Sequence, residues 1–562
     1  MTLNRLNTIA VLLVGLASAT ARAQDARFSH FTYTGSDARF EKPYDPACQF
    51  LNPILAGYYP DPSVCRVGDT YYLVNSSFAF FPGVPIFESH DLLHWTQIGH
   101  VLDRPSQLPL GDQGVSGGIF APDIKYNPHN KTFYMVTTNV GTGNFFVKTT
   151  DPHKGWSEPI RLPQVQGIDP SFFFDKDGTA YIVHNAAVEG GADYEGQTAI
   201  RILRFDTRGD SIVGSYSQIV RGGTHVEARP IWIEGPHLYR IGKYYYLMCA
   251  EGGTGDWHSE VIFRAPLKAD ITKAESWEEC PHNPILTQRT GLSADRPDMV
   301  TSTGHADLVQ AADGSWWAVF LGCRPYEGPF YNTGRDTYML PVTWSDGWPQ
   351  ILPPATPVPT VVDVTPHSPL TTHPSPLTGN FTFTDRFDTP QLNHRWIFLR
   401  NPEMQRYDWS GPGLTIHPTP SDISQRKPLS ALFYRQQHTD FTAETTVDFT
   451  PRSAKDVAGL ALLQNEQYNF VLGKTLLDGR PAVTLTRTER ETVLVASAFL
   501  TANAPLRLLV EGHGRYYTFC YAQGDEDSWH TLAAGVDAVN LSTSRAGGFI
   551  GTCIGLYATA QE

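Results

Sequence analysis

The sequence predicts an all-β protein in which a five-bladed β-propeller is followed by a β-sandwich domain. A unit of strand, tight turn and aromatic-rich second strand recurs five times in about the first 350 residues. Such repeats, spaced by about 40–50 residues and lengthened by insertions, are typical of propellers with four-stranded blades. After a proline-rich stretch, the last 180 or so residues contain short alternating strands without this repeat, which favours a β-sandwich.

The amino terminus has the features of an export signal. Residues 1–23 combine the basic Arg5, an apolar run from Ile9 to Ala17, and a small-x-small ending before Gln24. The apolar run is too short to span a membrane, and no later stretch is apolar for about 18 residues. We therefore expect a cleaved signal peptide, a periplasmic or secreted mature protein, and no membrane association.

The five units align on the aromatic residue that follows each turn. These anchors are Tyr72, Tyr134, Tyr181, Tyr246 and Trp317. A polar residue stands 11 or 12 positions before each anchor, at the start of the preceding strand. These polar residues are Asp61, Asp123, Asp169, Glu234 and His305. Turn chemistry would explain any one of them, but five in register predict side chains that converge at one end of a central channel.

Composition narrows the classes of partner. The formal net charge is −14 and no basic run is present, which argues against nucleic acid. Aromatic residues make up 12 % of the chain, and their abundance suits stacking on sugar rings. Seven cysteines show no CxxC pair, so neither a zinc site nor a dense disulfide framework is indicated, and the odd number leaves at least one thiol unpaired.

Five short motifs surround the polar residues. They are Tyr59–Ser63, Ala121–Asp123, Ile168–Ser171, Glu234–His237 and Gly304–Ala306. In order and type these motifs resemble glycoside hydrolase family 43, which contains five-bladed propeller β-xylosidases, α-L-arabinofuranosidases and arabinanases. The resemblance spans roughly residues 50–350, and the segment from Phe81 to Ile86 resembles the exo-acting β-xylosidase branch.

The resemblance implies a role for each of three carboxylates. Asp61 is expected to be the general base, Glu234 the general acid, and Asp169 the residue that orients the acid and tunes its pKa. The chemistry agrees, because an inverting glycosidase needs an acid and a base about 6.5–9.5 Å apart across the sugar ring. The acid must stay protonated near neutral pH, which burial and neighbouring negative charge both promote.

The resemblance also implies residues that bind the sugar. Phe78 matches an aromatic residue that lines the pocket for the terminal sugar, and Phe120 takes the place of a tryptophan usual in the family. Arg335 matches an arginine that binds sugar hydroxyls, and His305 matches a channel histidine that holds water or a calcium ion. Core packing and a surface salt bridge are the alternative roles for these residues. No cofactor is required on this interpretation, and a structural calcium ion is left open.

The carboxy-terminal half predicts a linker and a second domain. Residues 353–379 contain eight prolines, which indicates an extended linker between a propeller domain at 24–352 and a sandwich at 380–562. The sandwich resembles the concanavalin-like domain of the xylosidase branch, in which one loop closes the active-site pocket. Phe549 stands in the matching loop and is expected to contact the sugar on the leaving-group side.

These observations lead to three hypotheses of function. The first is an exported, inverting exo-glycosidase that removes terminal β-D-xylosyl residues from xylo-oligosaccharides or xylan. The second is an α-L-arabinofuranosidase acting on arabinoxylan or arabinan, because both pentoses present similar hydroxyls. The third is a non-catalytic sugar-binding propeller, which would be expected to have lost a carboxylate. The sequence does not indicate the oligomeric state.

Overall fold

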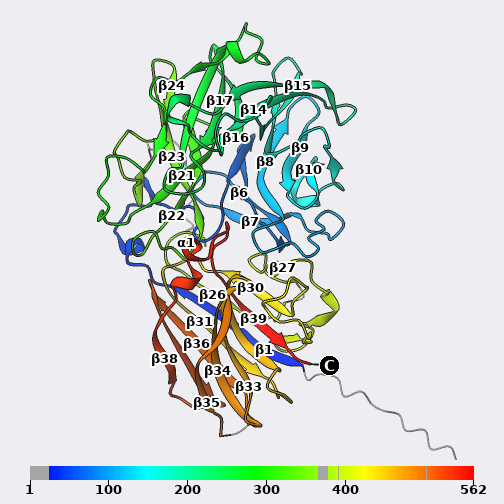
Figure 1. Ribbon diagram of the computed structural model, residues 1–562, viewed down its shortest axis with the longest axis vertical. Coiled ribbons are helices and arrows are strands. Elements are labelled where there is room, and N and C mark those ends of the chain that lie inside the picture. The colour runs from blue at the N-terminus through cyan, green and yellow to red at the C-terminus, as the bar shows by residue number, and fades with distance from the viewer. Residues whose placement is uncertain (1–24, 365–376, 390, 502, 562) are drawn as a thin grey trace, which may run out of the picture.

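The computed structural model describes residues 25–364, 377–389, 391–501 and 503–561, which form two bodies stacked along the long axis (Figure 1). Nearly all regular structure is strand, which confirms the predicted all-β fold. Helical turns are short: α1 (Thr543–Ala546), η1 (Ala38–Glu41), η2 (Pro152–Lys154), η3 (Val226–Ala228), η4 (Ala274–Ser276), η5 (Met404–Arg406) and η6 (Val539–Leu541). Within the described ranges no helix is long and apolar enough to cross a membrane. The expected export signal, residues 1–23, lies outside the described residues.

Five antiparallel sheets follow one another along the upper body. The first consists of β3 (Ser63–Val67), β4 (Thr70–Val74), β6 (Gly83–Ser89) and β7 (Thr96–Leu102). The second consists of β8 (Ile119–Asn127), β9 (Thr132–Asn139), β10 (Gly143–Thr149) and β11 (Ile160–Arg161). The third consists of β12 (Ile168–Phe174), β13 (Ala180–Ala187), β14 (Thr198–Asp206) and β15 (Ser211–Arg221). The fourth consists of β16 (Glu234–Ile241), β17 (Tyr244–Glu251), β18 (Ser259–Pro266), β19 (Glu278–Glu279) and β20 (Leu286–Thr287). The fifth consists of β21 (Thr301–Gln310), β22 (Trp316–Cys323), β23 (Arg335–Ser345) and β24 (Trp348–Gln350).

The first strand of each sheet faces one shared space. β3 contacts β8, β8 contacts β12, β12 contacts β16, β16 contacts β21, and β21 returns to β3. We call these five the inner strands and the space that they enclose the central channel. The five repeats seen in the sequence therefore correspond one to one with the five sheets.

Aromatic packing between neighbouring sheets accounts for the anchors of the repeat. Each anchor lies on the second strand of its sheet, and Tyr72 of the first sheet meets Phe133 of the second with ring centroids 5.1 Å apart. Tyr134 of the second sheet meets Phe172 of the third at 5.3 Å. Edge-on pairs of this kind add to the stability gained when large rings are buried.

All seven cysteines carry free thiols, and six of them are buried.

The lower body consists of two packed antiparallel sheets. One sheet has the order β28 (Tyr407–Asp408), β29 (Leu414–Ile416), β1 (Ala26–Gly35), β31 (Asp440–Asp448), β36 (Leu506–His513), β37 (Tyr516–Gln523) and β38 (His530–Asp537), with β26 (Thr382–Asp385) also on β1. The other has the order β30 (Ala431–Arg435), β39 (Cys553–Thr559), β32 (Val457–Asn465), β33 (Tyr468–Leu477), β34 (Arg480–Glu489) and β35 (Glu491–Phe499). In β31 buried and partly exposed residues alternate, as expected for a strand with one face on a sandwich core.

The expected boundary of the propeller domain at residue 24 is wrong. β1 lies in the sandwich, between β29 and β31, and Figure 1 shows it as a blue strand among yellow and orange ones. Buried residues alternate with more exposed ones along β1. This pattern fits a strand in a sheet that has one face against a core. The strand pattern is visible in the sequence, but the pattern does not say which distant sheet completes it.

Backbone pairing involves the expected linker and also joins the two bodies. β25 (Val361–Asp363), inside the expected linker, pairs with β2 (Gln49–Leu51), and both strands pack on the core of the upper body. β27 (Phe398–Leu399) pairs with β5 (Phe80–Phe81) of the upper body. The buried Arg435 of the sandwich donates from Nε to the carbonyl of Tyr58 at 3.1 Å. The two bodies are therefore held together by backbone pairing as well as by side chains.

Candidate active site

The polar residues at the starts of the inner strands lie at one end of the central channel. Asp61 lies two residues before β3, Asp169 is the second residue of β12, His305 is the fifth residue of β21, and Glu234 is the first residue of β16. A small cavity of about 10 Å³ beneath them is lined by Asp61, Asp169 and His305, together with Asp123. The convergence expected from the repeat register is therefore present in the structure.

Backbone geometry directs these side chains into the channel. Asp61, Asp169 and His305 have positive φ angles of 51°, 54° and 54°. The register shifts near the start of β12, β16 and β21, as at a β-bulge. Bulges and left-handed residues re-aim a side chain and are common at functional sites. The same local distortion therefore recurs in sheet after sheet.

Asp61 is held as an anion. Arg335 Nη1 donates to Asp61 Oδ1 at 2.9 Å, and the Ser76 hydroxyl donates to Oδ2 at 2.6 Å. Burial alone would raise the pKa of Asp61, but the charge of Arg335, then that of His305, outweighs it, so the pKa is lowered. A buried carboxylate that stays ionised and faces the channel can accept a proton from water.

Glu234 is held as a neutral acid. Burial, followed by the negative charge of Asp169, raises the pKa of Glu234 to about 8, although His305 opposes the shift. The carboxyl group therefore keeps its proton at neutral pH and can donate it. Asp61 and Glu234 are thus biased toward opposite protonation states.

Asp169 links the acid to His305. Asp169 Oδ2 accepts a hydrogen bond from the backbone N–H of Gly235 at 3.1 Å, directly after Glu234, and lies 3.6 Å from His305 Nε2. A Cβ atom at Gly235 would come within 2.9 Å of the His305 ring, and its φ of 54° also favours glycine. Asp169 therefore positions the strand end that carries Glu234.

The surroundings of His305 favour its protonated form, although its Nδ1 atom is buried without a hydrogen-bond partner among the described residues. Burial lowers the pKa of His305, but its hydrogen bond to Asp169 and the charge of Asp61 raise it to about 9. His305 thus acts here as a positive charge beside the carboxylates.

Three phenylalanines form an aromatic wall next to Arg335. Phe78 lies 5.5 Å from Phe120 and 5.9 Å from Phe549, measured between ring centroids. The Arg335 guanidinium carbon lies 5.7 Å from the Phe78 ring and 5.6 Å from the Phe549 ring. Phe549 comes from the sandwich, and its N–H donates to the Ser116 hydroxyl at 3.0 Å. All five predicted sugar-binding residues, His305 included, therefore lie around the carboxylates.

A layer of charges blocks the channel beneath this site. Lys125 Nζ lies 2.8 Å from Asp123 Oδ1 and 2.7 Å from Asp307 Oδ2, and His237 Nδ1 lies 3.3 Å from Asp123 Oδ1. The two carboxylates and His237 are close enough to surround a metal ion, but the Lys125 ammonium already binds both carboxylates. We call Asp123, Lys125, His237 and Asp307 the channel plug.

Of the four residues of the channel plug, sequence analysis singled out only Asp123. The spacing of Lys125 and Asp307 in the sequence could have indicated them. Lys125 and Asp307 stand two positions after Asp123 and His305, so each shares a face of its inner strand with the polar residue before it. Ser76 and Thr254, which contact Asp61 and Arg335 from neighbouring loops, carry no such periodic signal.

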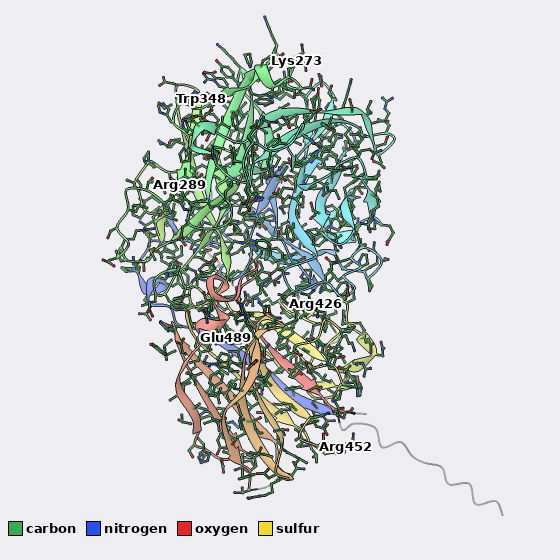
Figure 2. The ribbon with its side chains drawn as sticks, viewed as in Figure 1. Lys273, Arg289, Trp348, Arg426, Arg452 and Glu489 are labelled. Carbon is green, nitrogen blue, oxygen red and sulfur yellow. The ribbon has the colours of Figure 1, made fainter. Side chains whose placement is uncertain are left out.

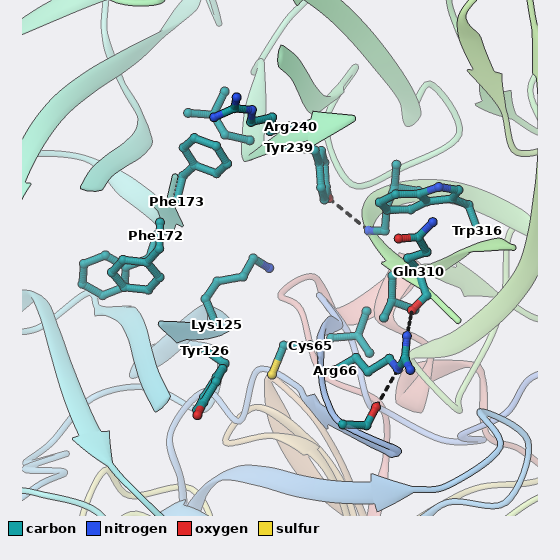
Figure 3. Close-up of a pocket in the computed structure, with 16 residues that line it drawn as sticks. Cys65, Arg66, Lys125, Tyr126, Phe172, Phe173, Tyr239, Arg240, Gln310 and Trp316 are labelled. Carbon is teal, nitrogen blue, oxygen red and sulfur yellow. Dashed lines mark hydrogen bonds between the residues drawn. The ribbon is translucent and has the colours of Figure 1, made fainter. Parts of the chain in front are cut away.

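A second hollow opens at the opposite end of the channel. Its volume is about 580 Å³, and residues of all five inner strands line it (Figure 3). Lys125 projects into it from the channel plug, near Cys65 and Tyr239 (Figure 3). Because the plug separates this hollow from the carboxylates, the candidate active site is closed at its base.

Comparison with known proteins agrees with this geometry. Residues 50–349 match the family model "Glycosyl hydrolases family 43", and residues 384–562 match "Beta xylosidase C-terminal Concanavalin A-like domain". The chain is 36 % identical to a "Xylosidase/arabinosidase" of Butyrivibrio fibrisolvens, over 91 % of this chain and 96 % of that protein. It is 34 % identical to the "Non-reducing end alpha-L-arabinofuranosidase BoGH43B" of Bacteroides ovatus, over 91 % and 92 % of the two chains. A crystal structure described as a GH43_12 from a capybara gut metagenome superposes with a TM-score of 0.88, at 43 % identity over 95 % of this chain and 99 % of that one.

Proposed function

Because this chain belongs to glycoside hydrolase family 43, we propose that it is an inverting exo-glycosidase that releases terminal pentose residues from xylan-type polysaccharides. The observation that carries the proposal is the pair of a protonated Glu234 and an ionised Asp61 at an end of the channel that the channel plug closes at its base. A closed pocket suits a chain end rather than the middle of a polymer. We also infer that the five sheets are the five blades of a propeller and that the chain is exported to the periplasm or the medium.

The proposed mechanism is a single displacement. Glu234 gives its proton to the glycosidic oxygen as the bond from C1 to that oxygen breaks. Asp61 takes a proton from a water molecule whose oxygen attacks C1 from the opposite face, so the released sugar has the inverted configuration. Asp169 positions Glu234 and raises its pKa, and Arg335 keeps Asp61 ionised while its remaining N–H groups face the sugar.

The identity of the pentose has two candidates. β-D-xylose is the first, because the aromatic wall and the sandwich loop with Phe549 resemble those of β-xylosidases. α-L-arabinofuranose is the second, because the relative at 34 % identity is named an alpha-L-arabinofuranosidase and the relative at 36 % identity is named both a xylosidase and an arabinosidase. The enzyme should act on xylan, arabinoxylan or arabinan fragments that present one of these sugars at a non-reducing end.

The test uses short natural substrates. Wild-type protein is incubated with xylobiose and with α-1,5-linked arabinobiose, beside Glu234→Gln and Asp61→Asn variants. We expect pentose release from one disaccharide and a loss of about 10²- to 10⁴-fold in the Glu234→Gln variant. Glu491→Gln, on the exposed face of the sandwich, is the control and should keep full activity.

Proton NMR of the first-formed anomer tests inversion separately. A β-linked xyloside should yield α-xylose before mutarotation. Retention of configuration would reject the single displacement, and full activity in both carboxylate variants would reject the assigned roles. Binding of either disaccharide with no hydrolysis at any pH would favour a non-catalytic sugar-binding propeller.

A further inference from the structure

Two exposed tryptophans stand on loops of the fourth sheet. Trp257 is 70 % exposed, more than any other large apolar side chain in the described part of the chain, and Trp232 is 48 % exposed. Large apolar side chains left in water contribute little to the fold and often mark a binding surface. Neither residue takes part in the mechanism derived above.

Strand direction places both loops at the active-site end of the channel. β16 begins there with Glu234, and β17 returns antiparallel so that Ala250 pairs with Glu234. The chain therefore enters β16 through the loop of Trp232 and leaves β17 through the loop of Trp257. Trp232 lies only two residues before Glu234 in the chain.

The loop after β17 also contacts the site directly. Arg335 Nη1, which binds Asp61, donates to the Thr254 hydroxyl at 3.1 Å. The ring of Trp232 lies against Gly253, where a Cβ atom would come within 2.4 Å of it. Trp232 and Trp257 thus lie on either side of Gly253 and Thr254, and Thr254 contacts Arg335 of the site.

Both tryptophans are held in place. Arg289 (labelled in Figure 2) donates from Nη1 to the Trp257 carbonyl at 2.7 Å, and its guanidinium lies 5.7 Å from the Trp257 ring. The next residue, His258, is buried and hydrogen-bonded to the Ser302 carbonyl at 2.9 Å. Trp232 has a φ of 49°, an unusual value for a bulky residue, and its N–H donates to the Gly196 carbonyl. Strain of this kind is found chiefly where a site requires it.

We propose that Trp232 and Trp257 bind the sugar residues on the leaving-group side of the bond that is cleaved. This inference rests on the proposed function and deepens it. The general acid contacts the leaving-group oxygen, so the leaving group must lie beside Glu234 and hence beside the loop of Trp232. Because the channel plug closes the base and Phe78 and Phe120 stand beside the first and second sheets, the leaving group has room to extend over the loops of the fourth sheet. An indole face suits the C–H face of a sugar ring, as aromatic walls do in ligand sites.

The test compares a substrate that has leaving-group sugars with one that has none. The oligosaccharide is the trimer or tetramer of whichever pentose is released, and the reference substrate is the corresponding glycosyl fluoride. In Trp257→Ala and Trp232→Ala, we expect kcat/KM on the oligosaccharide to fall about tenfold, chiefly through KM, which corresponds to the loss of one good stacking contact. Activity on the fluoride should stay within about twofold of the wild type.

Two further variants serve as controls. Trp257→Phe keeps an aromatic face and should recover most of the oligosaccharide activity. Trp344→Ala removes a partly exposed tryptophan from β23 near the opposite end of the channel. It should leave kcat/KM unchanged on both the oligosaccharide and the fluoride. Unchanged oligosaccharide kinetics, or an equal loss on both substrates, would overturn the proposal.

A failure of the proposed function is recognised separately. If the wild type hydrolyses neither substrate, calorimetric titration of the oligosaccharide into wild type and Trp257→Ala still tests the two tryptophans. Weaker binding to the variant supports them as a sugar-binding surface, and equal binding overturns it.

Discussion

At the scale of single residues, Asp61 and Glu234 are driven to opposite protonation states by different neighbours. Asp61 is paired with Arg335 and accepts a hydroxyl hydrogen bond from Ser76, both of which stabilise its charge. Glu234 faces Asp169 and receives no side-chain hydrogen bond among the described residues, so its neutral form is favoured. When the surroundings shift the pKa values of two carboxyl groups in opposite directions, one group can act as a base and the other as an acid.

The pH dependence follows from these two groups. We expect a bell-shaped profile of kcat/KM, because activity needs Asp61 ionised and Glu234 protonated. The acidic limb should lie at or below the ordinary aspartate range, since the pKa of Asp61 is lowered. The basic limb should lie near pH 8, where Glu234 loses its proton. Initial rates on a disaccharide between pH 3 and 10 measure both limbs, and a basic limb near pH 5 would contradict the assignment.

Asp169→Asn should move the basic limb to lower pH. The variant removes a negative charge that raises the pKa of Glu234, so Glu234 would lose its proton earlier as the pH rises. kcat should also fall, because the contacts to Gly235 and His305 weaken. Asp177→Asn, in an exposed turn away from the carboxylates, is the matched control and should leave the profile unchanged. A profile identical to that of the wild type would leave Asp169 with no electrostatic role.

At the scale of elements, the inner strands stack two layers of charge along the channel. The upper layer contains the candidate catalytic groups, and the channel plug forms the lower layer. Burial raises the pKa of Asp307, but His237 and Lys125 outweigh it, and the pKa is lowered. The plug carboxylates are therefore charged and depend on cations within the protein.

Lys125→Met should destabilise the upper body by about 3–5 kcal/mol, because it leaves Asp123 and Asp307 buried without their partner. Urea denaturation at pH 7 measures this. The difference from wild type should shrink as the pH falls below about 4, since a carboxyl with a lowered folded pKa stabilises only above its unfolded pKa. Lys154→Met, at a lysine whose side chain is 82 % exposed, should change the free energy of unfolding by at most about 0.5 kcal/mol.

Chelation should leave the enzyme unaffected. Lys125 and His305 supply positive charge where a channel cation would otherwise lie. We expect dialysis against EDTA to change neither kcat nor the melting temperature. Loss of activity that calcium restores would show that a metal binds in the channel after all.

At the scale of the whole molecule, the sandwich completes the pocket. Phe549 stacks against Phe78, and its carbonyl lies 3.4 Å from Arg335 Nη2. The buried Arg324 of the upper body forms ion pairs with Asp37 and Asp336 and also donates to the Gln437 carbonyl of the sandwich. The catalytic pocket and the interface between the two bodies therefore share one network of contacts.

The amino-terminal strand should be needed for folding of the carboxy-terminal domain. A chain that begins at residue 37 lacks β1, which lies between β29 and β31 in the sandwich. We expect it to be insoluble or to melt at least about 10 °C below a chain that begins at Gln24, the matched control. Differential scanning calorimetry measures this. Equal melting temperatures would mean that the sandwich closes without β1.

The sequence by itself determined the all-β class, the five repeats, the family and the polar residue at the start of each inner strand. These properties are local, because strand alternation, turn residues and motifs such as Ile168–Ser171 can each be recognised within a short segment of the sequence. Only the tertiary structure decided that β1 belongs to the sandwich, that Lys125 closes the channel, and which neighbours keep Asp61 charged and Glu234 neutral. Each of these depends on groups far apart in the chain, because partner choice, burial and the electric field at a carboxyl are set by what packs around it.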